Sequence, residues 1–215
     1  CSKPDELGHT GSIRGSIATH AREFSSRADS RYDLPHHSSY LFPARISQAL
    51  TEVAGDDSAK ALIVYIDSPG GTFVGGEMLF EALREVAEAK PVVAVMGTVA
   101  ASAGYMVAIA SDRIYARQGT ITGSIGVVFL KSNLRGFANW IGVNIDTIQK
   151  GENADLFSPF TSLEPEDELR VKEWMGAVYS DFVGKVAQGR ALEKEDVEAI
   201  AKGRIWSGAQ AKDRG

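Results

Sequence analysis

Ser102 is the residue of this sequence whose surroundings most favour chemistry. It lies in "GTVAASAGYMVAIASD", residues 97–112, directly after an apolar run and among alanines and glycines. A serine at a strand-to-helix junction has its hydroxyl near helix amides, where negative charge is favoured. Small neighbours would also let a substrate backbone approach closely. The same residues suit a helix packed on a sheet, so the stretch alone predicts either a nucleophile or a small packing residue.

A glycine-rich turn, "DSPGG" from Asp67 to Gly71, is a second candidate for chemistry. Glycine tolerates positive φ and carries no side chain, so the backbone N–H groups of such a turn can face outward. Outward N–H groups could hold an oxyanion. The alternative interpretation is a tight turn between a strand and a helix.

A nucleophilic serine needs a group that accepts its proton. A Ser-His-Asp triad would have to take its base from the polar first 40 residues, because every histidine of the chain lies there. A lysine with a depressed pKa is the other established solution. The four histidines are His9, His20, His36 and His37.

A second serine, Ser124, lies in "TGSIGV" and is also flanked by small and apolar residues. One interpretation is a polar residue at the start of a strand. The other is a hydroxyl that orients a general base. The local sequence leaves both open.

Short apolar runs alternate with amphipathic stretches along the chain, which predicts repeated strand–helix–strand units. Such units imply parallel pairing with right-handed crossovers and therefore an α/β domain. Apolar runs predict strands over 61–66, 92–96, 112–116, 124–129 and 143–149. Helical spacing or composition predicts helices over 42–56, 75–90, 100–110, 133–142 and 165–188.

Composition bounds the class of protein. The 215 residues are 44% apolar and 24% charged, with a net charge of −5 and no basic stripe, so nucleic acid is not an expected partner. No run reaches the roughly 18 apolar residues of a spanning helix. The single cysteine, Cys1, excludes an internal disulfide and a cysteine-based zinc site. We expect a polar, mobile or partner-dependent arm over 1–40 and one domain over 41–215.

Four stretches in this order and spacing resemble the bacterial signal peptide peptidases of the SppA type. The resemblance runs from about residue 43 to residue 215 and implies a serine protease. The implied fold is the α/β fold shared by the Clp protease subunit and crotonase. It has repeated β-β-α units, a parallel sheet and a C-terminal helical extension. The stretches are "IDSPGGTF", "ASAGYMVAIASDRIYA", "TGSIGVV" and "GRIWSGAQAKDRG".

The resemblance implies a role for particular residues. The family's catalytic serine corresponds to Ser102, and its oxyanion donors to the backbone N–H groups of Gly71 and Ala103. The serine that hydrogen-bonds the catalytic lysine corresponds to Ser124. The lysine itself is expected in a pattern like "G-x-x-K-D-x-x-SP", and this sequence reads "GENADLFSP" there, with Ala154 at the lysine position.

Alanine at position 154 leaves Ser102 without the family's base. It is consistent with an engineered inactive form, with the serine-bearing half of a longer two-repeat member, or with a homologue that binds without cutting. Lys150, four residues earlier, is either a solvated lysine or a substitute base.

The implied function is a membrane-associated serine peptidase that degrades leftover signal peptides and is nearly inactive as given. The resemblance implies that a peptide substrate binds in extended form beside Gly70–Gly71 and that no metal or cofactor is needed. It also implies a location at the extracytoplasmic side of the bacterial membrane, with anchoring by a segment absent from this chain. We further expect a homo-oligomer. We expect the contacts of this oligomer near residues 1–40 and near the apolar side of the 165–188 helix. Alternatives are a peptide-binding or scaffolding homologue and a crotonase-like acyl-CoA enzyme, although no acidic pair lies near the glycines.

Overall fold

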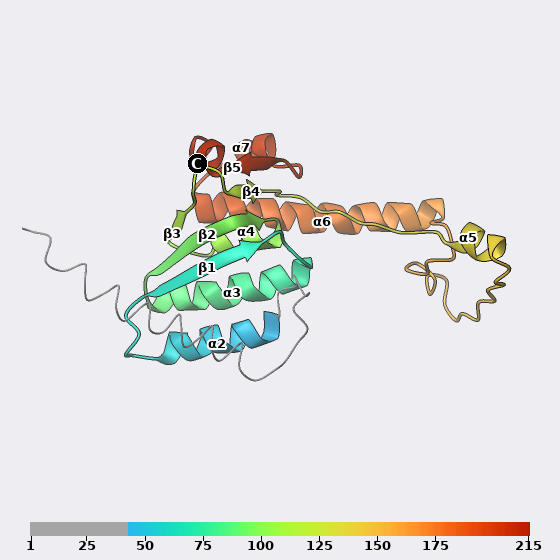
Figure 1. Cartoon of the computed structure of the whole chain (residues 1–215), viewed down its shortest axis with the longest axis horizontal. Helices are drawn as coiled ribbons and strands as arrows, with labels where there is room; N and C mark the ends of the chain where they lie inside the picture. Colours follow the sequence, from blue (N-terminus) through green and yellow to red (C-terminus); the bar gives the residue numbers. More distant parts are fainter. Residues whose placement is uncertain (1–42) are drawn as a thin grey trace, which may run out of the picture. The chain divides into compact units, whose positions relative to one another are not determined.

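The computed structural model describes residues 43–215, and the predicted arm over 1–40 lies outside the described residues. The described chain forms two compact units (Figure 1). Unit 1 comprises 43–125 and Val183–Gly215, and unit 2 comprises Gly126–Phe182. None of the described helices is long and apolar enough to cross a membrane.

Unit 1 is built on a five-stranded sheet with the order β1-β2-β4-β5, and β3 also pairs with β2. The first strands pair in parallel, as the alternation of strands and helices predicts, whereas β4 and β5 are antiparallel. The carboxyl ends of β1 and β2 therefore lie side by side at one edge of the sheet. The strands are β1 Leu62–Ser68, β2 Val92–Ala101, β3 Arg113–Tyr115, β4 Ile121–Gly123 and β5 Ile205–Ser207.

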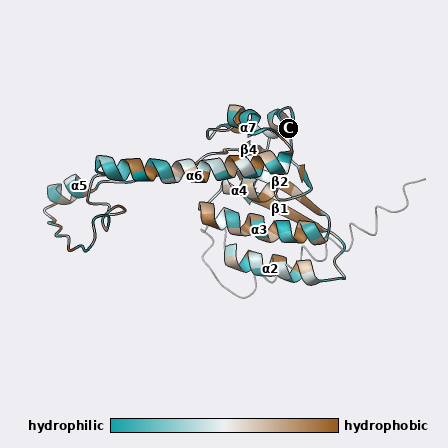
Figure 2. Cartoon of the chain, turned by 180° about the vertical axis from the view of Figure 1, so that it is seen from behind, coloured by the Kyte–Doolittle hydropathy of each residue, from teal (hydrophilic) through white to brown (hydrophobic). Residues whose placement is uncertain are grey.

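Helices cover one face of this sheet. Helix α3 buries Leu83 and Val86 completely, and each such side chain contributes about 1.5–3 kcal/mol of hydrophobic stabilisation. Figure 2 shows strands β1 and β2 as largely hydrophobic ribbons beside these helices. Helix α3 packs against both α2 and α4. The helices are α2 Pro43–Gly55, α3 Phe73–Ala89 and α4 Ala103–Ala108.

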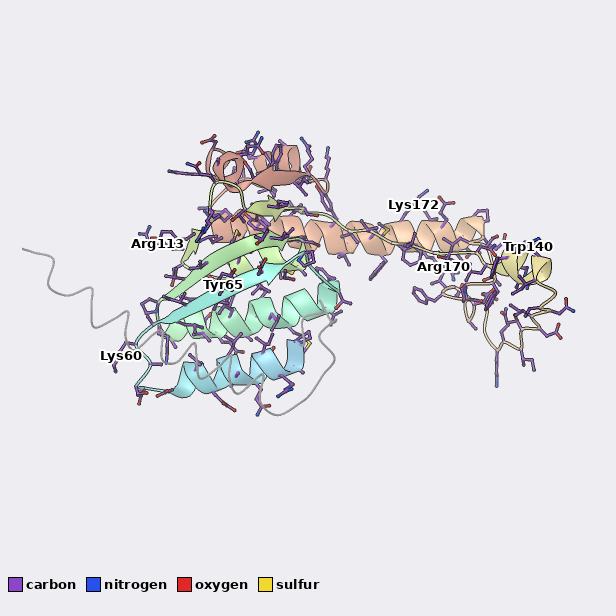
Figure 3. The ribbon with its side chains drawn as sticks, in the orientation of Figure 1. Lys60, Tyr65, Arg113, Trp140, Arg170 and Lys172 are labelled. Carbon is purple, nitrogen blue, oxygen red and sulfur yellow. The ribbon has the colours of Figure 1, made fainter. Side chains whose placement is uncertain are left out.

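The opposite face of β1 is open in the described chain. Alternate residues of a strand point to opposite faces, and Ile66 and Ser68 are buried, whereas Tyr65 is 66% exposed. Tyr65 projects from β1 in Figure 3. The sheet is thus half-covered by the residues that the structure describes.

The C-terminal part of unit 1 closes the sheet beyond β4. Ser207 caps α8 through a reciprocal capping box with Gln210, which satisfies two backbone N–H groups at the helix start. Arg214 stacks over the Trp206 ring at 3.9 Å. The helices here are the end of α6 Pro165–Arg190, then α7 Lys194–Ile200 and α8 Gly208–Lys212.

Unit 2 contains α5 Arg135–Trp140, the first part of α6 and long irregular segments. Many of its large apolar side chains face solvent in the described chain, and Trp140 lies on α5 (Figure 3). Besides Trp140, they are Val128, Leu130, Leu134, Phe137, Ile141, Val143, Ile148, Phe157, Leu169 and Trp174.

Three predicted elements are wrong. The helix predicted over 100–110 begins later, because β2 continues to Ala101 and α4 begins at Ala103. The strand predicted over 124–129 does not form: β4 ends at Gly123, and Ser124 has φ 50°, which turns the chain out of the sheet. The segment 143–149 is not a strand either. Both apolar segments lack a pairing partner among the described strands, and isolated strands are not stable.

Candidate active site

Ser102 lies between the end of β2 and the start of α4. Its backbone has φ 52° and ψ −125°, a combination that non-glycine residues rarely adopt and that costs about 1–3 kcal/mol. Its side chain does not cap α4, and the residue is partly exposed. Strain of this kind persists only where the surroundings enforce it, so the fold holds this serine in one orientation.

The Gly70–Gly71 loop lies directly against Ser102. A Cβ added at Gly70 would be 2.8 Å from Ser102 Cβ and 3.2 Å from Ser102 Oγ, so Oγ is beside this loop. The loop is held from below by buried Ser68, whose Oγ accepts from the Gly70 N–H at 3.2 Å. A Cβ at Gly104 of α4 would approach Ser68 O to 2.8 Å, so loop and helix are in close contact.

Ser124 is connected to Ser102 through the backbone. The Ser102 N–H donates to Gly123 O at 3.0 Å, and the Ser124 N–H donates to Arg204 O at 2.7 Å. Ser124 is partly exposed. The structure therefore brings Ser102, the Gly70–Gly71 loop and Ser124 together in unit 1. The convergence of the Gly71 and Ala103 amides on one oxyanion, in a groove, stays a prediction.

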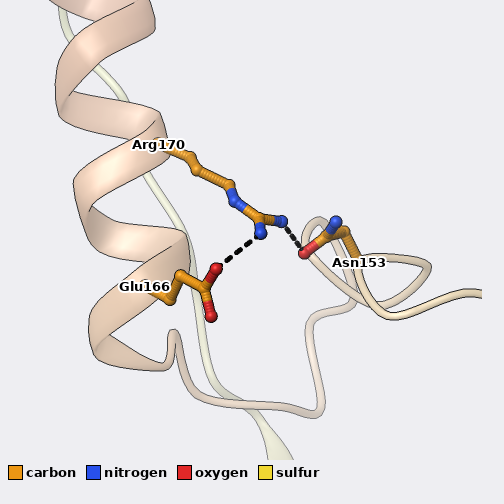
Figure 4. Close-up of polar contacts among 3 residues, drawn as sticks. All are labelled: Asn153, Glu166 and Arg170. Carbon is orange, nitrogen blue, oxygen red and sulfur yellow. Dashed lines mark hydrogen bonds and ion pairs between the residues drawn. The ribbon is translucent and has the colours of Figure 1, made fainter.

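Ala154 belongs to unit 2 and is exposed. The segment that carries it is anchored beside this residue: Arg170 of α6 donates to Asn153 Oδ1 and to Glu166 Oε1, the latter at 2.7 Å (Figure 4). On the other side, Lys131 Nζ donates to Leu156 O at 2.8 Å. Position 154 therefore lies between a side-chain contact at Asn153 and a backbone contact at Leu156, both within unit 2.

Lys185 and Tyr105 are two further ionisable side chains of unit 1. Lys185 Nζ is held in an ion pair with Glu77 Oε1 at 3.2 Å. Burial raises the pKa of Tyr105 above its usual value, partly offset by Arg190, so this phenol keeps its proton at neutral pH. Lys150 is exposed in unit 2, and the histidines lie outside the described residues. Among residues 43–215, no group of three His, Cys, Asp or Glu side chains could hold a metal ion.

Three side chains hold the end of β2 from both sides, and the sequence analysis predicted none of these contacts. Asp67 Oδ1 accepts from the Val99 N–H at 3.0 Å. Thr120 Oγ1 donates to Gly97 O and buried Thr122 Oγ1 donates to Ala100 O, both at 2.8 Å. A signal for the threonines exists in the sequence, since "GTITG" places two hydroxyls at alternate positions just before Ser124. Their targets on β2 cannot be deduced without the register.

The mostly parallel sheet of unit 1, with helices packed on one face, is an α/β arrangement of the Clp protease type. The sequence profile of Clp protease matches residues 39–119, and that of peptidase family S49 matches residues 84–215. The chain belongs to peptidase family S49. The predicted SppA-type family is thereby confirmed.

Known proteins agree with this assignment. The chain is 35% identical over 178 residues to "Serine protease SPPA, chloroplastic" of Arabidopsis thaliana, covering 82% of this chain and 26% of that protein. It is 32% identical over 170 residues to "Putative signal peptide peptidase SppA" of Enterococcus faecium, covering 77% and 48%. The chain thus spans about a quarter to a half of these relatives.

A solved structure confirms the predicted fold class. A point mutant of ClpP1 from Listeria monocytogenes superposes with a TM-score of 0.52 at 15% identity, over 80% of each chain. At this identity the likeness concerns the fold alone.

Proposed function

We propose that this chain is the serine-bearing domain of a peptidase that degrades residual signal peptides, with Ser102 as nucleophile. The observation that carries the proposal is the enforced backbone of Ser102, φ 52° and ψ −125°, beside the Gly70–Gly71 loop. Membership of a peptidase family and relatives with signal peptide peptidase names support it.

In the proposed mechanism, Ser102 Oγ attacks the peptide carbonyl carbon and gives its proton to a neutral amine base. The Gly71 and Ala103 N–H groups donate to the oxyanion, a contribution that is typically worth 10²–10³ in rate for each donor. The base then protonates the leaving amine, and water releases the acyl group from Ser102. Ser124 would hold the base amine by a hydrogen bond.

The base must come from elsewhere than position 154, because the side chain there is a methyl group. We propose that this domain alone is nearly inactive and that a lysine from another part of a longer protein, or from another copy, completes the dyad. The lengths of the relatives support this proposal. The chain matches only 26% of the length of the Arabidopsis protein and 28% of the length of Protease 4 of Haemophilus influenzae.

The substrate would bind in extended form and pair its backbone with the chain beside Gly70–Gly71. Small or hydrophobic side chains, as signal peptides carry, would fit apolar pockets. The resemblance to SppA-type peptidases implies that the domain works at a bacterial membrane, on the extracytoplasmic side. No metal or cofactor takes part in this proposal.

The assignment of Ser102 as nucleophile is tested by comparing how fast a serine-reactive probe modifies Ser102 and other serines. A fluorophosphonate probe at mildly alkaline pH is expected to modify Ser102 in preference to exposed Ser162, because the proposed oxyanion donors, the Gly71 and Ala103 N–H groups, would stabilise the adduct at Ser102. Peptide mapping by mass spectrometry measures the sites, and Ser102→Ala is the control. Adducts spread over exposed serines without preference for Ser102 would contradict the assignment.

We also propose that the domain forms a homo-oligomer through unit 2. The apolar side chains of α6 differ in exposure. Val171, Val178 and Phe182 are buried, whereas Leu169 and Trp174 are 57% and 53% exposed and remain available for assembly. Exposed patches of this kind mark interaction sites in soluble proteins.

Sedimentation velocity at micromolar concentration is expected to show species larger than the 23.1 kDa monomer. Trp140→Ser, at a side chain that is 81% exposed, should shift the distribution toward monomer without unfolding. Val74→Ser, exposed in unit 1, is the matched control. A purely monomeric chain would count against assembly.

A further inference from the structure

The pairing of β1 with β2 is interrupted just before Ser102. Ile66 pairs with Met96, but the next pair is Ser68 with Ala100. Over this interval β1 advances by two residues and β2 by four, so β2 bulges at Gly97–Val99. Bulges of this kind bend a strand, redirect side chains and are common next to active sites.

The bulge leaves a backbone donor of β2 without a partner on the β1 backbone, and a side chain replaces it. Asp67, the β1 residue within the interruption, accepts from the Val99 N–H through Oδ1 at 3.0 Å. Asp67 and this contact are exposed to solvent, which screens the carboxylate charge.

Gly97 makes room for this contact. A Cβ added at Gly97 would lie 2.6 Å from Asp67 Cγ and 2.5 Å from Tyr65 Oη. The Asp67 side chain therefore folds across the bulge at the place where β2 has no side chain. Any larger residue at 97 would displace it.

On the far side of β2, the Thr120 and Thr122 hydroxyls hold the carbonyls of Gly97 and Ala100. The Ser102 N–H is held by Gly123 O. Asp67 is the contact that restrains the bulge from the β1 side, three residues before the strained serine.

We propose that Asp67 is a positioning residue: its carboxylate, through the Val99 N–H, fixes the bulge of β2 and thereby the orientation of Ser102. The proposal rests on Ser102 being the nucleophile for its catalytic consequence, but its structural part stands alone. An acceptor oxygen at this place is what matters, and the negative charge is secondary.

The test compares Asp67→Ala, which removes the acceptor, with Asp67→Asn, which keeps an isosteric oxygen. Amide hydrogen exchange, resolved by residue, is expected to speed up about tenfold at Val99 and Ser102 in Asp67→Ala. In Asp67→Asn it should stay within about threefold of the parent. Exchange in α3 should be the same in all three proteins, which shows that the variants are folded.

Fluorophosphonate modification of Ser102 provides the second readout. It should slow about tenfold in Asp67→Ala and recover in Asp67→Asn. If Ser102 exchange changes as expected but no form is modified at Ser102, even when Ala154→Lys supplies a base, Asp67 positions the strand and the nucleophile assignment fails. Unchanged exchange at Val99 and Ser102 in Asp67→Ala would overturn the positioning role, as would an equal loss in Asp67→Asn.

Discussion

Ala154→Lys is expected to raise Ser102-dependent peptide hydrolysis by about a hundredfold or more. A general base contributes typically 10²–10⁴ in rate, and position 154 is where the SppA pattern has its lysine. The neighbouring Asn153 side chain and Leu156 carbonyl accept hydrogen bonds from Arg170 and Lys131, which restrain the segment that would carry the new side chain. Hydrolysis of an apolar peptide with a fluorogenic leaving group measures the effect.

The substitution should not harm folding, because Ala154 is exposed and such surface changes usually stay within about 0.5 kcal/mol. Exposure also sets a condition on activity. The free pKa of a lysine is about 10.4. Its amine becomes a neutral base near pH 7 only when burial removes it from solvent and lowers this pKa. The gain should therefore be largest when substrate or another copy covers position 154, and should grow with protein concentration if assembly provides the cover.

Ser102→Ala, made in both backgrounds, is the control. Equal hydrolysis by the parent and by Ala154→Lys, abolished by Ser102→Ala, would show that another group is the base, and Lys150→Ala would then be examined first. No hydrolysis by either form would contradict the idea that Ser102 and a lysine introduced at position 154 are a sufficient dyad. It would favour a base supplied by a missing repeat, or a domain that binds peptide without cutting.

Much of unit 1 could be predicted from the sequence because local and tertiary preferences agree there. The run "ALIVYI" is short, apolar and followed by Pro-Gly-Gly, and it forms β1. The stretch before Pro91 has helical spacing and forms α3, where Leu79 and Leu83 are buried. Once two such units alternate, parallel pairing places the ends of β1 and β2, and hence Gly70 and Ser102, side by side.

The rest depends on pairing that no local pattern specifies. Val128 belongs to the strand predicted over 124–129, yet its side chain is 90% exposed and the segment pairs with no strand among the described residues. The small residues before Ser102 suit a helix or a strand. They form a strand because they pair with β4. Asp67 reads as part of a turn motif. Its contact with Val99 exists only because the sheet pairing breaks between Ile66 and Ser68.

Gly70→Ala is expected to lower both stability and Ser102 reactivity. Gly70 has φ +123°, where L-residues are strained, and its new methyl would lie 2.8 Å from Ser102 Cβ and 3.2 Å from Ala101 O. Backbone strain and overpacking each cost about 1–3 kcal/mol, so the free energy of unfolding should fall by at least about 2 kcal/mol. Urea unfolding measures this loss. Relief of the contact must also move the loop away from Ser102, so fluorophosphonate modification of Ser102 should slow about a hundredfold, as when an oxyanion donor is lost.

Gly71→Ala is the matched control one residue further along the loop. A Cβ at Gly71 meets no atom within 4 Å, and its φ is not positive. The backbone N–H that we assign to the oxyanion is retained, so unfolding should change by no more than about 0.5 kcal/mol. A small phosphonate should still modify Ser102 at close to the parent rate. Equal behaviour of the two variants would show that the close approach of Gly70 does not set the reactivity of Ser102. If Gly71→Ala alone lost the modification while its stability was unchanged, the reactivity of Ser102 would depend on the surface at Gly71 that the substrate contacts.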